Sequence, residues 1–246
     1  YCQKEGNILI EKGALPTEEY TAKEGVWVKI QRMVKDGATW LEICDEYPNV
    51  AIHMGSAIQR YKLELDMQNA GWRDVHVTYV SGATGTGKTR GICEAYGYPN
   101  VYRVTDYKHP FDAYNGQDVI VFEEFRMGRK PKIDFAQMLS FIDGHPIKLP
   151  CRYSDRQAMF TRIFLVSNWE LEQQYPWTQE DYPQDWECFL RRLEHPRRGD
   201  VDSIKIMTKE DGQRFKESLE FDIHWLREST NPAGLADVTH QSNEEE

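Results

Sequence analysis

The sequence predicts an α/β fold: a parallel sheet with helices on both faces, preceded by a small helical module. From residue 71 onward, short apolar runs typical of buried strands alternate with segments of helical periodicity. The first apolar run ends in a glycine-rich loop of the phosphate-binding type, which belongs between a strand and a helix. Residues 25–70 repeat apolar residues at helical spacing only, which indicates helices without strands.

The helical module is expected to hold three short helices. Its apolar positions fall into three groups: Val26, Ile30, Met33 and Val34; Trp40, Leu41 and Cys44; Ala57, Ile58, Tyr61 and Leu65. Gly37 and Pro48 are interpreted as the ends of the first two helices. A helix–turn–helix arrangement can read DNA. The exposed faces mix both signs of charge, however, so we favour a packing or oligomerisation module.

Four strands and four helices are predicted after this module. The strands are His76–Val80, Asn100–Val104, Asp118–Phe122 and Arg162–Val166. The helices are Lys88–Ala95, Phe135–Ile142, Trp186–Glu194 and Glu210–Leu226. Strands that alternate with helices favour a parallel sheet, whose polar ligands collect beyond the carboxyl ends of the strands.

The glycine-rich loop fits the pattern G-x-x-x-x-G-K-[ST] without a mismatch. Its residues are Gly82, Ala83, Thr84, Gly85, Thr86, Gly87, Lys88 and Thr89. Glycines let the backbone curl so that successive N–H groups point at phosphate oxygens. Lys88 can reach the β- and γ-phosphates, and the Thr89 hydroxyl can bind Mg²⁺. A glycine-rich turn without a ligand is the alternative, but the position of the loop between a strand and a helix favours phosphate binding.

Two carboxylates follow the predicted strand that ends at Phe122. Glu123 is expected to hold Mg²⁺ through its hydration shell, and Glu124 to orient or deprotonate the attacking water. An ordinary acidic turn exposed to water is the alternative. The phosphate-binding loop 35 residues earlier, counted from Lys88 to Glu123 (123 − 88), favours the functional interpretation.

Asn168 follows the last predicted strand. An amide there can bind the γ-phosphate or position the water, because it offers a donor and an acceptor without charge. An isolated Asn after a strand more often caps a turn. Its place as the third polar group at a strand end favours the functional interpretation.

Three basic segments remain open to more than one interpretation. Residues 147–160 are expected to form a hairpin. Its Arg152 and Tyr153 could contact phosphate and stack on a base, with support from Lys148 and Arg156. The alternative is a hairpin that is exposed to water and binds nothing. The run from Arg126 to Lys132 faces DNA, a neighbouring subunit or water. Arg191 and Arg192 lie on a predicted helix and either reach a nucleotide on an adjacent subunit or form surface ion pairs.

Composition limits the remaining possibilities. The formal net charge of −10 argues against a nonspecific basic coat for nucleic acid, but not against a local basic loop. No apolar run approaches the length that spans a bilayer, so no membrane partner is expected. Five scattered cysteines without a C-x-x-C pair favour reduced thiols and no zinc site. Residues 229–246 are expected to be a disordered acidic tail.

Together the motifs resemble the superfamily 3 helicase region of Rep proteins, the rolling-circle replication initiators of circular single-stranded DNA viruses and related bacterial plasmids. The resemblance covers residues 1–215. Its parts are Walker A at Gly82–Thr89, Walker B at Val119–Glu124, the B′ hairpin at Ile147–Phe160, motif C ending at Asn168 and an arginine-finger region at Arg191–Arg192. The sequences Leu149–Tyr153 and Phe189–Arg192 look similar to those of plasmid-type members.

The resemblance implies an AAA+-like ATPase that translocates on single-stranded DNA as a homo-oligomeric ring, a hexamer, with ATP and Mg²⁺ between subunits. It implies that residues 25–70 assemble the ring and that residues 71–228 form the helicase domain. The compartment would be the bacterial cytoplasm for a plasmid protein and the host nucleus for a viral one. One departure is Glu123-Glu124, where many relatives have Asp; Glu can do both jobs with a longer side chain.

The resemblance also explains the first residues. Tyr1-Cys2-Gln3-Lys4 has the Y-x-x-K form that ends the family's nuclease domain, so residues 1–24 are expected to be the end of that domain and a linker. In the family this tyrosine attacks DNA. None of the seven His forms the partner motif H-x-H, so we do not expect this chain itself to nick DNA. The chain lacks an initiator Met, so we expect a fragment or a processed chain.

Two other classes stay open as alternatives. One is a P-loop enzyme of another kind, such as a small-molecule kinase; a GTPase is disfavoured because no N-K-x-D motif is present. The other is a scaffold that binds nucleotide in order to assemble and does not hydrolyse it.

Overall fold

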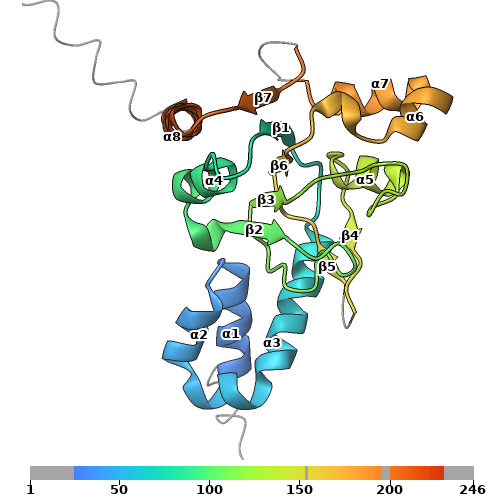
Figure 1. Ribbon diagram of the computed structural model, residues 1–246. Helices are drawn as coiled ribbons and strands as arrows, with labels where there is room; N and C mark the ends of the chain where they lie inside the picture. The colour runs from blue at the N-terminus through green and yellow to red at the C-terminus, as the bar shows by residue number, and fades with distance from the viewer. Residues whose placement is uncertain (1–24, 153–154, 195–199, 230–246) are drawn as a thin grey trace, which may run out of the picture. The chain divides into compact units, whose positions relative to one another are not determined.

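The computed structural model describes residues 25–152, 155–194 and 200–229 (Figure 1). Within them the chain forms two compact units, which divide between Asn69 and Ala70. The expectations for Tyr1, for the linker up to residue 24, for Tyr153 and for most of the acidic tail fall outside the described residues. No helix in the described part of the chain is long and apolar enough to cross a membrane.

The first unit consists of three helices, α1 (Val26–Lys35), α2 (Trp40–Glu46) and α3 (Pro48–Gln68). Its small core is formed by Ile30, Val34, Ile43 and Ile58. Thr39 caps α2, because its hydroxyl accepts from the Glu42 amide while the Glu42 carboxylate accepts from the Thr39 amide. Pro48 opens α3 at its first position, where its missing N–H costs nothing, and does not simply end the preceding helix as the sequence suggested.

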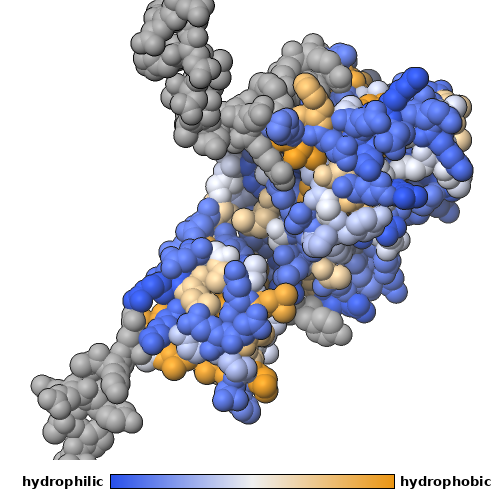
Figure 2. Space-filling view, turned by 90° about the vertical axis from the view of Figure 1, so that its left-hand side faces the viewer, coloured by the Kyte–Doolittle hydropathy of each residue, from blue (hydrophilic) through white to orange (hydrophobic). Residues whose placement is uncertain are grey.

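The three helices leave several large apolar side chains in solvent. Leu41 is 70% exposed and Ile52 is 78% exposed, and Val26, Val28 and Met54 are also largely accessible. Figure 2 shows exposed hydrophobic surface on this unit. A bundle of this size cannot bury all of its apolar residues by itself.

The second unit is built on a five-stranded sheet in the order β2-β3-β6-β1-β7. The strands are β1 (His76–Gly82), β2 (Val101–Val104), β3 (Val119–Phe122), β6 (Arg162–Val166) and β7 (Ser203–Ile206). Every neighbouring pair is parallel. The predicted α/β fold with a parallel sheet is therefore confirmed. Strand β7 was not predicted, because it is only partly buried and carries Ser203 and Lys205 among its four residues.

The central strands bury both faces, as expected of a parallel sheet between helices. Ile120 and Phe122 of β3 enter one core cluster, whereas Val119 and Val121 enter the other. Helices α4 (Lys88–Tyr96) and α8 (Lys209–Ser229) cover the second face; α5 (Phe135–Phe141) and α7 (Pro183–Arg192) cover the first (Figure 1). Covering both faces leaves the carboxyl-terminal edge of the sheet as the place where loops gather.

The remaining elements are short. They are the 3₁₀ turns η2 (Tyr98–Asn100) and η3 (Leu171–Gln173), the helix α6 (Pro176–Asp181) and the strands β4 (Lys148–Leu149) and β5 (Arg156–Gln157). Strands β4 and β5 pair antiparallel, which confirms the predicted hairpin. Helix α6 was not predicted.

Two glycines allow the phosphate-binding loop to sit close to its neighbours. Gly82 has φ +132°, and a Cβ there would lie 1.8 Å from the carbonyl oxygen of Ile206 in β7. A Cβ on Gly212 of α8 would lie 2.1 Å from the carbonyl oxygen of Thr86. Any larger residue would push β7 or α8 away from the loop, so both glycines are required by close backbone approach.

Candidate nucleotide-binding site

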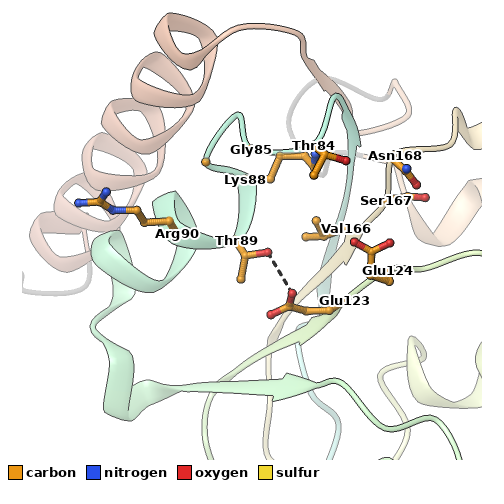
Figure 3. Close-up of a pocket in the computed structure, with 11 residues that line it drawn as sticks. Thr84, Gly85, Lys88, Thr89, Arg90, Glu123, Glu124, Val166, Ser167 and Asn168 are labelled. Carbon is orange, nitrogen blue, oxygen red and sulfur yellow. Dashed lines mark hydrogen bonds between the residues drawn. The ribbon is translucent and has the colours of Figure 1, made fainter.

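One cavity lies at the carboxyl-terminal ends of β1, β3 and β6 (Figure 3). The loop after β1 and the start of α4 form one side of it. Glu123 and Glu124 follow β3, and Ser167 and Asn168 follow β6. The structure therefore brings together the three motifs that the sequence placed at strand ends, and all of them line the same cavity.

The glycine-rich loop curls around its own lysine. Gly85 and Gly87 have φ +81° and +92°, in the left-handed region that glycine adopts without strain. The ammonium group of Lys88 donates to the carbonyl oxygens of Gly82 and Ala83, each at 2.7 Å. Burial lowers the pKa of Lys88, and the nearby Glu124 carboxylate opposes that shift. The cation thus lies over the loop, next to where phosphate oxygens would enter.

Thr89 and Glu123 place two side-chain oxygen atoms close together in the cavity. The Thr89 hydroxyl lies 3.5 Å from Oε2 of Glu123, and Oε1 of Glu123 pairs with Arg103 of β2. The Tyr107 hydroxyl donates to the Glu123 carbonyl oxygen at 2.8 Å and fixes the backbone there. Hydroxyl and carboxylate oxygens are the ligands that Mg²⁺ prefers, so these residues fit a magnesium ion that keeps several of its waters.

Glu124 turns away from Glu123. Its backbone adopts φ +49°, which is uncommon for a residue with a side chain and is often found at functional sites. Figure 3 shows Glu123 directed toward Thr89 and Glu124 directed toward the segment that holds Ser167 and Asn168. The two neighbouring carboxylates therefore face different parts of the cavity.

Arg126 joins Glu124 to Asn168. Its Nη2 lies 2.5 Å from Oε2 of Glu124, and its Nε donates to Oδ1 of Asn168 at 2.7 Å. The sequence placed Arg126 in a basic run that faced DNA, a subunit or water, and it gave no sign of this connection. The only feature of the sequence that could have indicated this contact is a charged residue two positions after Glu124.

Gln174 is a second residue that the sequence did not suggest. It is fully buried, and its amide nitrogen donates to the Tyr79 hydroxyl at 2.7 Å and to the Phe125 carbonyl oxygen at 3.0 Å. Its amide oxygen accepts from the Met127 amide at 2.7 Å. This side chain ties strand β1 to the loop that carries Arg126.

The hairpin residues lie outside the cavity. Lys148 is exposed and Arg156 is half-buried on the paired strands. Arg152, near the tip, pairs with the carboxylate of Asp112, which also accepts from the Arg152 amide at 3.0 Å. These two hydrogen bonds from Arg152, first from its amide and then from its side chain, lower the pKa of Asp112.

The two arginines of α7 have different surroundings, and neither lines the cavity. Arg192 donates to a carboxylate oxygen of Asp143 at 2.7 Å and 3.2 Å and to the Cys188 carbonyl oxygen at 3.0 Å. Arg191 is exposed. Desolvation raises the pKa of Asp143, but hydrogen bonds from the His145 amide and Arg192 outweigh it, so the net shift is downward.

Comparisons with known proteins agree with this geometry. Residues 78–168, which run from β1 to Asn168, match the family described as RNA helicase. The replication-associated protein of beak and feather disease virus is 26% identical over 74% of this chain and 57% of its own length. That of canary circovirus is 23% identical over 76% of this chain and 57% of its own length. That of porcine circovirus 2 is 24% identical over 68% of this chain and 51% of its own length.

The chain spans about half the length of the curated relatives it matches. The matched segment covers the strands and loops that form the cavity. The reported relatives are all circovirus proteins. The comparisons thus confirm the resemblance to the Rep proteins of circular single-stranded DNA viruses, and the match to the helicase family covers residues 78–168.

Proposed function

We propose that this chain is the ATP-hydrolysing motor of a replication initiator, with residues 71–228 as the motor domain. It would bind ATP and Mg²⁺ in the cavity and use hydrolysis to move single-stranded DNA. The observation that carries the proposal is the meeting of Lys88, the Glu123–Glu124 pair and Asn168 from three strands in one cavity. Positioning and charge stabilisation are the main tasks in phosphoryl transfer, and these groups supply both.

Each side chain has a task that its position supports. Lys88 would exchange its two loop carbonyl oxygens for the β- and γ-phosphates. Thr89 and Glu123 would hold Mg²⁺, which shields the phosphate charge. Glu124 would accept a proton from the attacking water, and Asn168 would donate to the γ-phosphate.

The proposal is tested by ATP hydrolysis with and without single-stranded DNA. Lys88→Ala should reduce hydrolysis to background, because the phosphates lose their cation. Lys108→Ala is the matched control, since Lys108 is an exposed lysine outside the cavity lining. A Lys88→Ala variant that hydrolyses ATP as fast as the Lys108→Ala variant would overturn the proposal.

The nucleic acid is proposed to be single-stranded DNA. The matched family's description names RNA, whereas the relatives' names refer to replication. Stimulation of hydrolysis by DNA and RNA strands of identical sequence separates the two. We propose that Lys148, Arg152, Tyr153 and Arg156 of the hairpin contact the strand, because basic side chains, of which Lys148 and Arg152 are exposed, suit phosphate contacts and an aromatic residue beside them suits base stacking.

Self-association is proposed through residues 25–70. The exposed Leu41 and Ile52 offer apolar surface for another copy of the chain. The resemblance implies a ring of six subunits. In such a ring Arg191 would reach the nucleotide of a neighbouring subunit, because Arg192 already pairs with Asp143. Sedimentation of wild-type chain and of Leu41→Asp and Ile52→Asp variants tests this; unchanged sedimentation of the variants would contradict it.

Two further proposals concern the whole protein. Since the reported relatives are viral, the host nucleus is the proposed compartment. Nicking and joining of DNA through Tyr1 is proposed for a longer chain that also carries an H-x-H motif. Adding such a segment and assaying cleavage of a single-stranded origin, with Tyr1→Phe as the control, tests it.

A further inference from the structure

Arg126 occupies a position between two cavity residues that come from different strands. Glu124 follows β3, and Asn168 follows β6, 42 residues away from Arg126 in sequence. The guanidinium contacts both side chains at once, through Nη2 and Nε. Its side chain is 39% exposed, so it lies at the rim of the cavity and not in the core.

The chemistry of the guanidinium determines which way the amide of Asn168 points. A guanidinium has only donors, so it can bond only to the oxygen of a neighbouring amide. Oδ1 of Asn168 accordingly accepts from Arg126 at 2.7 Å. The amide nitrogen must then point to the other side as a donor. Without Arg126, an amide can turn by half a rotation and present its oxygen, which phosphate would repel.

Arg126 also restricts the carboxylate of Glu124. The contact involves Oε2. In the described part of the chain no hydrogen bond to Oε1 is formed, so this oxygen is available to accept from a water molecule. A carboxylate fixed at one oxygen presents the other in a defined direction, whereas one on an exposed loop samples many rotamers.

Buried hydrogen bonds fix the backbone on both sides of Arg126. The Gln174 amide group bonds to the Phe125 carbonyl oxygen at 3.0 Å and to the Met127 N–H at 2.7 Å. The Phe125 amide donates to the Val166 carbonyl oxygen at 2.8 Å, at the end of β6. Because these bonds are buried, the main chain that carries Arg126 cannot shift readily relative to β6 and Asn168.

We propose that Arg126 is a positioning residue for ATP hydrolysis: it orients the Asn168 amide as a donor and fixes one oxygen of Glu124. This inference rests on the proposed function. It assigns Arg126 to the site in place of the DNA or subunit contact that its basic run suggested. Arg129 of the same run provides the contrast, because it pairs with Glu180 between side chains that are 61% and 53% exposed, away from the cavity.

The test measures kcat and KM for ATP in the full chain with single-stranded DNA. Arg126→Ala should lower kcat by about tenfold or more and change KM by less than about threefold, because misplaced reacting groups slow the chemical step more than they weaken binding. Arg129→Ala should leave both constants unchanged. Equal kcat values for the two variants would overturn the inference.

Two further variants separate positioning from charge and from general loss of structure. Arg126→Lys keeps the charge but loses the planar fork, so kcat should stay close to that of Arg126→Ala; full rescue would contradict the proposal. Asn168→Ala combined with Arg126→Ala should be less slow than the product of the two single effects, because both changes remove the same Arg126–Asn168 contact; effects that multiply in full would contradict it. If the wild type and Lys88→Ala both fail to hydrolyse ATP, the proposed function fails instead.

Discussion

The hydroxyl of Thr89 lies 3.5 Å from a carboxylate oxygen of Glu123, although 34 positions separate the two residues in the chain. Thr89 lies in the first turn of α4, and Glu123 follows β3. Glu124, the next residue, turns toward Arg126 and has an exposed side chain. The carboxylate that faces the hydroxyl is therefore the one suited to metal, and its neighbour is the one suited to water.

This geometry predicts different kinetic effects for the two carboxylates. Glu123→Ala should raise the Mg²⁺ concentration for half-maximal hydrolysis by about tenfold or more, because a metal-orienting oxygen is lost. Glu124→Gln should lower kcat by about 100-fold or more with the Mg²⁺ dependence unchanged, because an amide cannot accept the proton. Magnesium titrations of both variants check this, and identical titration curves would contradict it. Chelation of Mg²⁺ should stop hydrolysis in the wild type.

The two arginines of α7 should separate stability from activity. Arg192→Ala should lower the free energy of unfolding by about 1 to 2 kcal/mol, because Asp143, which is only 22% exposed, loses a charged partner. Arg191→Ala should change stability by less than about 0.5 kcal/mol, as expected for an exposed side chain, but should slow hydrolysis by about 1,000-fold if it acts in trans. Urea unfolding and hydrolysis assays test both, and the reverse pattern would reject the assignment.

Tyr79 should make the free energy of unfolding depend on pH in the alkaline range. Burial raises the pKa of its hydroxyl to about 12. A phenol in the unfolded chain has a pKa of about 10, so the folded state keeps the proton to a higher pH than the unfolded state does. The neutral Tyr79 side chain therefore contributes its full stabilisation below about pH 10. It is lost as pH rises from about 10 to 12, by up to about 1.4 kcal/mol per pH unit.

Tyr79→Phe isolates this effect from other tyrosines. The variant also loses the hydrogen bonds with the Trp169 carbonyl oxygen and Gln174, so it should be less stable than the wild type at pH 8. The difference in unfolding free energy should shrink above pH 10. Denaturant titrations across this range measure it, and a difference that stays constant up to pH 12 would count against a buried neutral phenol.

Asp112 should restrain the hairpin. Because its carboxylate pairs with Arg152, Asp112→Asn should free that arginine and tighten single-stranded DNA binding. Lys148→Ala should weaken binding and make the slope of log K against log salt less steep by about 0.7, the value for one lost phosphate contact on a single strand. Fluorescence anisotropy at several salt concentrations checks both. Asp181→Asn, an exposed residue on α6, is the control, and an equal effect of the two Asn variants would argue against this role.

The local sequence pattern was sufficient to predict most of the sheet and the three motifs at strand ends. Strand β3 is a continuous apolar run, and β1 and β6 are largely apolar, because both faces of these strands are buried; their ends, and the polar residues after them, could therefore be located. Strand β7 lies at the edge and buries mainly Ile206, so its sequence resembles a loop. Helices α6 and α7 both begin at prolines, which pattern alone assigns to breaks as readily as to first turns.

The contacts within the site could not be predicted in the same way. Arg126 and Asn168 are adjacent only because β3 and β6 pair side by side. Gln174 lies 95 residues from Tyr79, and no local spacing indicates that its amide bonds to that hydroxyl. The different surroundings of Arg191 and Arg192 likewise depend on Asp143, which lies in the loop after α5. Such pairings follow from topology and not from neighbouring residues.

The most direct measurement is a structure of the chain bound to Mg²⁺, a non-hydrolysable ATP analogue and single-stranded DNA. The central claim predicts that Lys88 releases its loop carbonyl oxygens and contacts the phosphates, that Thr89 and Glu123 lie at the metal, and that the Asn168 amide nitrogen faces the γ-phosphate. A triphosphate bound anywhere other than among these residues, or one that leaves Lys88 on the oxygens of Gly82 and Ala83, would contradict it.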